Sequence, residues 1–178
     1  KHRCEYRDYA ILYRGNHQAR LFEKLLRENA IPYHISGGQS FFERAEVKDL
    51  LAYLRLMANP EDDSAFLRVV NVPRREIGAG TLEKLGAYAA SRRTGLLHAS
   101  LEMGLTEVLS ARAVERVQGF AGWMENQARR ASEEDPARVA RELVEAIRYE
   151  DWLLEQSPSP KAAARRMENV NEVLEWMA

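Results

Sequence analysis

One signal recurs along the chain and constrains its fold more than any other. A helix-capping residue stands directly before proline at Asn59-Pro60, Asp135-Pro136 and Ser159-Pro160. Proline suits the first position of a helix because the backbone N–H that it lacks has no partner there. Apolar residues then follow at the spacing of one helical face. From Ser40 onward, the sequence therefore predicts an almost entirely helical region.

Within this region the pattern predicts where individual helices lie. Apolar spacing from Leu105 to Met124 indicates one long helix, and the polar stretch 131–135 is expected to be a loop. Pro60 is expected at the first position of a helix whose positive end attracts the acidic residues that follow it. We interpret Asp62 and Asp63 as capping residues of that helix rather than as paired catalytic carboxylates.

The first forty residues follow a different pattern. Tyr9–Tyr13 and Ile31–Ile35 are short runs of aromatic and branched residues, which are typical of strands. Between them, Gly15-Asn16 supplies a turn and a cap for a helix. This strand–helix–strand order indicates part of a parallel sheet. The expected fold class is mainly α, with an all-helical domain at residues 39–178 and a small β-α-β segment at residues 1–38.

Composition limits the kind of partner. The 178 residues include 26 Lys and Arg against 27 Asp and Glu, a formal net charge of −1, so any polyanion site must be local. The single cysteine, Cys4, excludes an internal disulfide and a cysteine-rich zinc site. No apolar run is long enough to span a membrane and the start is not a signal peptide, so we expect a cytoplasmic protein. The missing initiator methionine and the helical pattern at the chain's end suggest a piece of a longer protein.

Motifs that carry catalysis are not found in the sequence. No glycine is followed by lysine, which a phosphate-binding loop requires. Neither Gly-x-Ser-x-Gly nor His-Glu-x-x-His occurs, and the four histidines are scattered. We therefore expect no catalytic residue, no metal site and no cofactor in this chain.

The turn Ile77-Gly78-Ala79-Gly80 leads directly into a predicted helix. Glycines let backbone N–H groups approach a ligand closely, and a helix N-terminus favours an anion. Residues 66–93 hold six basic against two acidic residues, a local net charge of +4. The turn is either a grip on one DNA phosphate, as in helix–hairpin–helix modules, or a plain connection between helices. The candidate DNA-binding residues are Arg74, Arg75, Ile77, Gly78, Gly80, Thr81 and Lys84.

A second candidate segment follows the first predicted strand. Open α/β sheets bind ligands just beyond the ends of their strands. Four side chains at this place can donate to phosphate or sugar oxygens, namely Arg14, Asn16, Gln18 and Arg20. The alternative is an ordinary polar loop between a strand and a helix.

Four blocks of the sequence together resemble a known family. They are YAILYRGNHQAR at Tyr9–Arg20, IPYHISGGQSFFERAEVKDLLAYLR at Ile31–Arg55, DDSAFLRVVNVPRREIGAGTL at Asp62–Leu82 and SPSPKAAARRMENV at Ser157–Val170. These blocks resemble the Rep/UvrD/PcrA group of superfamily 1 DNA helicases. The wording Arg-Glu-Ile-Gly, at Arg75–Gly78, is most similar to the Rep branch. The resemblance covers essentially the whole chain.

The resemblance implies a place in a larger motor protein. Such helicases have two RecA-like domains, 1A and 2A, with insertions called 1B and 2B. Residues 1–38 would be part of 2A, and residues 39–178 would be the 2B insertion. The parent would be an ATP-dependent 3′→5′ helicase using ATP and Mg²⁺. The family's ATP-binding motifs lie outside this segment, so we expect the chain itself to hydrolyse no ATP.

The resemblance also assigns DNA contacts. The Tyr-Arg-x-Asn loop that touches single-stranded DNA in the family maps onto Arg14 and Asn16. The Gly-Ile-Gly loop that touches the duplex maps onto Glu76-Ile77-Gly78, with glutamate at the first position. A carboxylate beside a phosphate site lowers affinity unless it turns away.

Two functions remain open on these grounds. The leading interpretation is an accessory region that binds duplex or junction DNA and regulates unwinding. The alternative is a protein-interaction or autoregulatory module with little DNA affinity of its own. Its basis is the stretch 142–155, with five acidic residues and one basic, a net charge of −4. We expect a monomer or a weak dimer.

Overall fold

The computed structural model describes residues 4–36 and 38–177. Its regular elements are helices, with three short 3-10 helices among them. The first half of the chain contains η1 (Tyr6–Asp8), α1 (Asn16–Glu28), η2 (Phe41–Glu43), α2 (Ala45–Ala58), α3 (Asp63–Val69) and α4 (Ala79–Arg92). It is followed by α5 (Leu96–Leu101), η3 (Met103–Glu107), α6 (Ala111–Glu133), α7 (Pro136–Ala146), α8 (Tyr149–Glu155) and α9 (Pro160–Glu175). The predicted mainly α fold class is confirmed.

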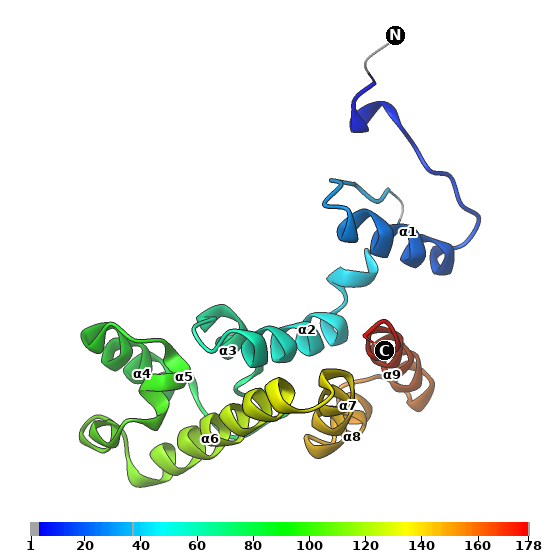
Figure 1. Cartoon of the computed structure of the whole chain (residues 1–178). Coiled ribbons are helices and arrows are strands. Elements are labelled where there is room, and N and C mark those ends of the chain that lie inside the picture. Colours follow the sequence, from blue (N-terminus) through cyan, green and yellow to red (C-terminus); the bar gives the residue numbers. More distant parts are fainter. Residues whose placement is uncertain (1–3, 37, 178) are drawn as a thin grey trace.

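The helical body is elongated, with α6 running between its two ends (Figure 1). Helices α4 and α5 lie at one end, and α7, α8 and α9 lie at the other. Helix α2 packs against α3, α6 and α9. One core runs through the body, with Val47, Leu56, Phe66, Val117 and Leu143 all fully buried. Phe66 meets Phe120 edge-on at 5.6 Å between ring centroids, which joins α3 to α6.

The predicted β-α-β segment is wrong: α1 is present, but residues 4–36 contain no strand on either side of it. Tyr9–Tyr13 and Ile31–Ile35 are irregular. Parallel strands need neighbours to pair with and layers that cover both faces. Here Leu12 is 94% exposed, and the described residues offer it no pairing strand. Strand-forming residue types alone therefore do not make a strand at this place.

Helix starts follow the capping signals at two of three places. Asp135 and Ser159 cap α7 and α9 through their side chains, each followed by proline, as predicted. At the third place the helix begins at Asp63 and not at Pro60, and Asp62 is its cap, with its carboxylate accepting from the N–H of Ala65 at 2.9 Å. That hydrogen bond is the main reason why the pKa of Asp62 is lowered.

The predicted long helix is also shifted along the chain. Ser110 caps α6, so the helix begins at Ala111 instead of near Leu105. The preceding apolar residues lie in η3 and the turn after it. At the other end, α6 continues to Glu133, so most of the predicted loop at 131–135 is helical. Leu105 and Leu109 are buried as the apolar spacing predicts, but Val108 is 38% exposed, and the pattern does not show the break before the cap at Ser110.

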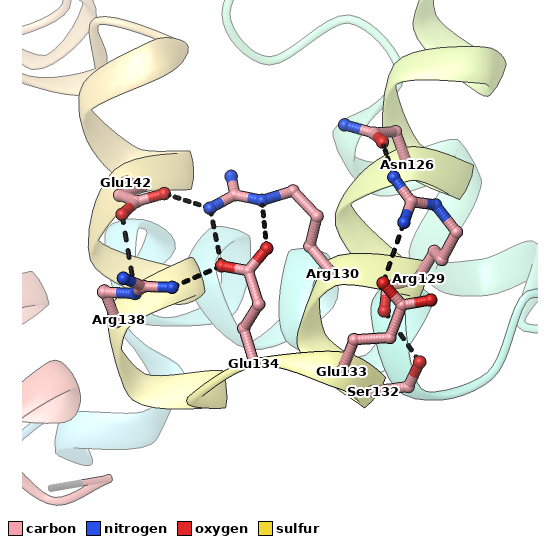
Figure 2. Close-up of polar contacts among 8 residues, drawn as sticks. All are labelled: Asn126, Arg129, Arg130, Ser132, Glu133, Glu134, Arg138 and Glu142. Atoms are coloured by element: carbon pink, nitrogen blue, oxygen red, sulfur yellow. Dashed lines mark hydrogen bonds and ion pairs between the residues drawn. The ribbon is translucent and has the colours of Figure 1, made fainter.

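An arginine–glutamate cluster joins the end of α6 to α7 (Figure 2). Arg130 donates to Glu134 at 3.0 Å and also to Glu142, while Arg138 donates to Glu134 at 2.5 Å. Hydrogen bonds from Arg130 and then Arg138 lower the pKa of Glu134. The cluster connects the end of α6 to α7 across the short turn at Asp135.

Buried polar contacts attach the last helices to α2. Asp49 accepts from the hydroxyl of Tyr149 at 2.8 Å and pairs with Arg68 at 2.7 Å. Glu46 accepts from Asn169 at 2.7 Å and from Arg166 at 3.2 Å. Because a buried carboxylate is costly without partners, these bonds define one position of α8 and α9 on α2.

Candidate nucleic-acid interface

The glycine turn before α4 is anchored in the core on one side and faces open space on the other. Ile77 is buried and anchors the turn in the core. Asn71 accepts from the N–H of Arg75 at 2.7 Å, which orders the preceding loop. A Cβ placed on Gly78 or Gly80 would meet nothing within 4 Å, so both glycines face open space. Gly78 caps α4 without a side-chain hydrogen bond, which leaves the helix N-terminus free to receive an acceptor.

Arg74 and Arg75 are adjacent but point in different directions. The Arg75 guanidinium turns inward, where Nη2 donates to the hydroxyl of Tyr53 at 2.8 Å. Its Nη1 donates to the backbone carbonyls of Val69 at 3.0 Å, Pro73 at 3.2 Å and Val70 at 3.3 Å. Its Cζ lies 4.7 Å from the ring centroid of Phe120. Burial raises the pKa of Tyr53 to about 12, so this hydroxyl stays neutral.

The geometry therefore divides the predicted cations. Arg75 is occupied inside the protein and does not fit the predicted role of a phosphate contact. Arg74 is exposed beside the turn, and Lys84 is exposed one helical turn above Gly80. Neither has an ion partner within the part of the chain that the structure describes. Thr81, half-buried in the first turn of α4, completes the set that the structure brings together.

Glu76 stands at the position where the family resemblance expects glycine, and its carboxylate is paired with arginines of α6. Its φ is +57°, a left-handed conformation that glycine adopts easily and glutamate rarely does. Its carboxylate pairs with Arg116, and with Arg112 at 3.4 Å. Nη1 of Arg116 also donates to the backbone carbonyl of Glu76 at 3.1 Å.

Arg112 and Arg116 are residues of this surface that sequence reasoning missed. Both belong to α6, four residues apart and therefore on one helical face. With Pro73, Arg74 and Arg75 they line a groove between the loop before α4 and the first turns of α6. No local motif marks them, because they lie 36 and 40 residues beyond Glu76.

The second predicted segment is mostly used within the protein. Gln18 accepts from the backbone N–H groups of Arg14 at 3.0 Å and Gly15 at 3.3 Å, so it caps α1. Arg20 pairs with Glu172 on α9, and its Cζ lies 5.2 Å from the ring centroid of Phe41. Arg14 remains exposed, while the side chain of Asn16 lies outside the described residues. Of the two polar side chains described on the helix, Arg20 is paired within the protein, and Gln18 uses its Oε1 for capping while remaining exposed.

The acidic stretch 142–155 is partly neutralised. Glu142 belongs to the cluster with Arg130, and Asp151 pairs with Arg148 at 2.7 Å. Over residues 4–36 and 38–177, no group of three or more side chains is placed to hold a metal ion. Across the same residues, every helix is too short or too polar to cross a bilayer.

Comparison with known proteins gives the family to which this chain belongs. A family model described as the UvrD-like helicase C-terminal domain matches residues 1–148. The chain belongs to the UvrD-like helicase family.

Individual relatives agree over nearly the whole chain. The ATP-dependent DNA helicase Rep of Salmonella typhimurium is 55% identical over 175 residues, which are 98% of this chain and 26% of the relative. The protein of the same name from Escherichia coli K12 gives the same values. The ATP-dependent DNA helicase PcrA of Bacillus subtilis is 37% identical over 167 residues, or 94% of this chain and 22% of that protein. The chain thus spans about a quarter of the length of these relatives.

Proposed function

We propose that this chain is the accessory, 2B-type region of an ATP-dependent 3′→5′ DNA helicase, preceded by a part of the 2A motor domain. Residues 39–178 form the accessory region and residues 1–38 belong to the motor domain. ATP and Mg²⁺ act elsewhere in the parent protein, and this chain alone hydrolyses no ATP. Its own role is to contact duplex or junction DNA and so to regulate unwinding.

One observation carries the DNA contact: the open N-terminus of α4 lies between two exposed cations. Gly78 and Gly80 leave room for a phosphate, and Arg74 and Lys84 flank it without internal partners among the described residues. Backbone N–H groups and point charges bind phosphate without reading sequence. Contact with any DNA duplex, regardless of sequence, is therefore the expected mode.

A salt titration of a labelled duplex–single-strand junction with the 178-residue chain tests this function. Each neutralised phosphate contributes about −0.9 to the slope of log affinity against log salt. Arg74→Ala and Lys84→Ala should each weaken binding and reduce the slope by about one unit. Lys161→Ala, which removes an exposed cation on α9, is the matched control and should change neither. Binding that is absent at low salt, or flat with salt, contradicts the DNA role and favours the protein-interaction alternative.

A further inference from the structure

Glu76 is an anion that pairs with arginines of the basic groove. Four arginines line this groove together with Glu115, namely Arg74, Arg75, Arg112 and Arg116, and Glu76 contacts the two that belong to α6. The same residue stands immediately before Ile77-Gly78, so its backbone is continuous with the open turn. The carboxylate therefore holds two guanidinium groups beside the place where a phosphate is proposed to bind.

The conformation of Glu76 indicates that this contact is specific. A left-handed backbone at a residue with a long side chain is unfavourable, and it persists only where the surroundings enforce it. Here Arg116 contacts the residue twice, through the carboxylate and through the carbonyl of the same residue. The loop before α4 is consequently tied to the first turns of α6 through one acidic residue.

The contact is nevertheless accessible to competition. The side chain of Glu76 is 56% exposed and that of Arg112 is 77% exposed, whereas that of Arg116 is 27% exposed. The pair with Arg112 contributes little to stability because water and salt screen it. A DNA phosphodiester carries the same single charge as a carboxylate and matches the paired N–H groups of arginine equally well. It can therefore compete with Glu76 for these guanidinium groups.

We propose that Arg112 and Arg116 form a second DNA-phosphate position beside the glycine turn, and that Glu76 occupies it as an internal counter-ion until DNA displaces it. The inference rests on the proposed function, because it requires duplex DNA to lie along the start of α4. It adds that DNA affinity is held down by this one carboxylate. It also extends the contact surface from α4 to α6.

Glu76→Gln tests this inference in the same junction assay, since it keeps the shape of the side chain and removes its charge. We expect Glu76→Gln to tighten binding about three- to tenfold at low salt. Glu83→Gln is the matched control: it removes one exposed carboxylate from α4 that has no arginine partner in the described structure. An equal gain from both variants, or no gain from Glu76→Gln, overturns the inference.

Arginine substitutions provide an independent arm that does not depend on the strained residue. Arg112→Ala alters an exposed side chain and should weaken binding while reducing the salt slope by about one unit. Combined with Arg116→Ala, it should abolish the gain from Glu76→Gln. Unchanged binding by Arg112→Ala overturns the second position.

The two proposals fail in different ways. If Arg74→Ala weakens binding but the Glu76 and Arg112 variants do not behave as described, the DNA role is supported and the counter-ion role of Glu76 is wrong. If neither the unmodified chain nor Glu76→Gln binds the junction at low salt, both proposals are wrong.

Discussion

Helices α4 and α5 both begin after a glycine, yet their starts differ. At α5 the N–H of Leu96 is taken by the carboxylate of Asp63 at 2.7 Å. A Cβ on Gly95 would lie only 2.8 Å from Oε2 of Glu61, whereas one on Gly78 would meet nothing within 4 Å. The difference teaches that a glycine before a helix does not by itself make a binding site. What decides is whether the protein's own acids already occupy the helix start.

The largest expected effect concerns Arg75, whose hydrogen bonds hold the loop before the open start of α4. Arg75→Ala removes donors to Tyr53 and to three backbone carbonyls. Hydrogen bonds from a charged group are worth about 1.5–3 kcal/mol each, and partly buried acceptors would be left unsatisfied. We expect the free energy of unfolding to fall by about 2–3 kcal/mol in urea denaturation. The neighbouring Arg74→Ala should change it by less than about 0.5 kcal/mol. Equal losses of unfolding free energy in the two variants would show that the internal hydrogen bonds of Arg75 do not stabilise the fold.

The next effect places an acid at the open start, making α4 resemble α5. Gly80→Asp meets no steric obstacle, and a carboxylate in the first turn favours the helix dipole. We expect an unchanged or raised melting temperature but at least about tenfold weaker junction binding, which corresponds to about 1.4 kcal/mol. Gly80→Asn has nearly the same shape without the charge and should lose much less affinity. Wild-type affinity in the aspartate variant would refute the α4 contact.

A smaller effect is expected when the occupied start of α5 is uncovered. Asp63→Ala removes the acceptor of the Leu96 N–H and should cost about 1 kcal/mol of folding stability, as for other helix caps. Denaturant midpoints measure the loss, and Asp63→Asn should recover part of it. Junction binding should not change, because α5 faces its own acids. A gain in DNA affinity would mean that the α5 start is also a site once it is uncovered.

The smallest expected effect is the pH dependence of the stability that the Asp62 cap gives to α3. The pKa of Asp62 is lowered, first by the N–H of Ala65, so its stabilisation of α3 is present above the ordinary value of about 3.9. It is lost as the pH falls through the lower folded value. Asp62→Asn should therefore be less stable than wild type at pH 7, and the difference should shrink as the pH falls below the ordinary value. A gap in urea midpoint that stays constant as the pH is lowered through the acid range would contradict this origin.

Local features were predictable from sequence, and long-range ones were not. Asp135-Pro136 and Ser159-Pro160 mark real helix starts because a cap and its helix are neighbours in the chain. The strands at Tyr9–Tyr13 and Ile31–Ile35 failed because a strand depends on partners elsewhere.

The candidate surface shows the same division. Its glycine turn was visible as a pattern, and the placement of Gly78 at the start of α4 is confirmed. Which of Arg74 and Arg75 faces outward depends on Tyr53 and Phe120, distant in sequence. The contact of Glu76 with Arg116 spans 40 residues and leaves no local trace.

Helix α6 connects the two ends of the molecule mechanically. Arg116 and Arg130 lie on the same helix, 14 residues and therefore about 21 Å apart. The first borders the proposed DNA groove, and the second is locked to α7. Because both arginines project from one continuous helix, a displacement of α6 at the groove would be carried to its contact with α7 as a rigid-body movement.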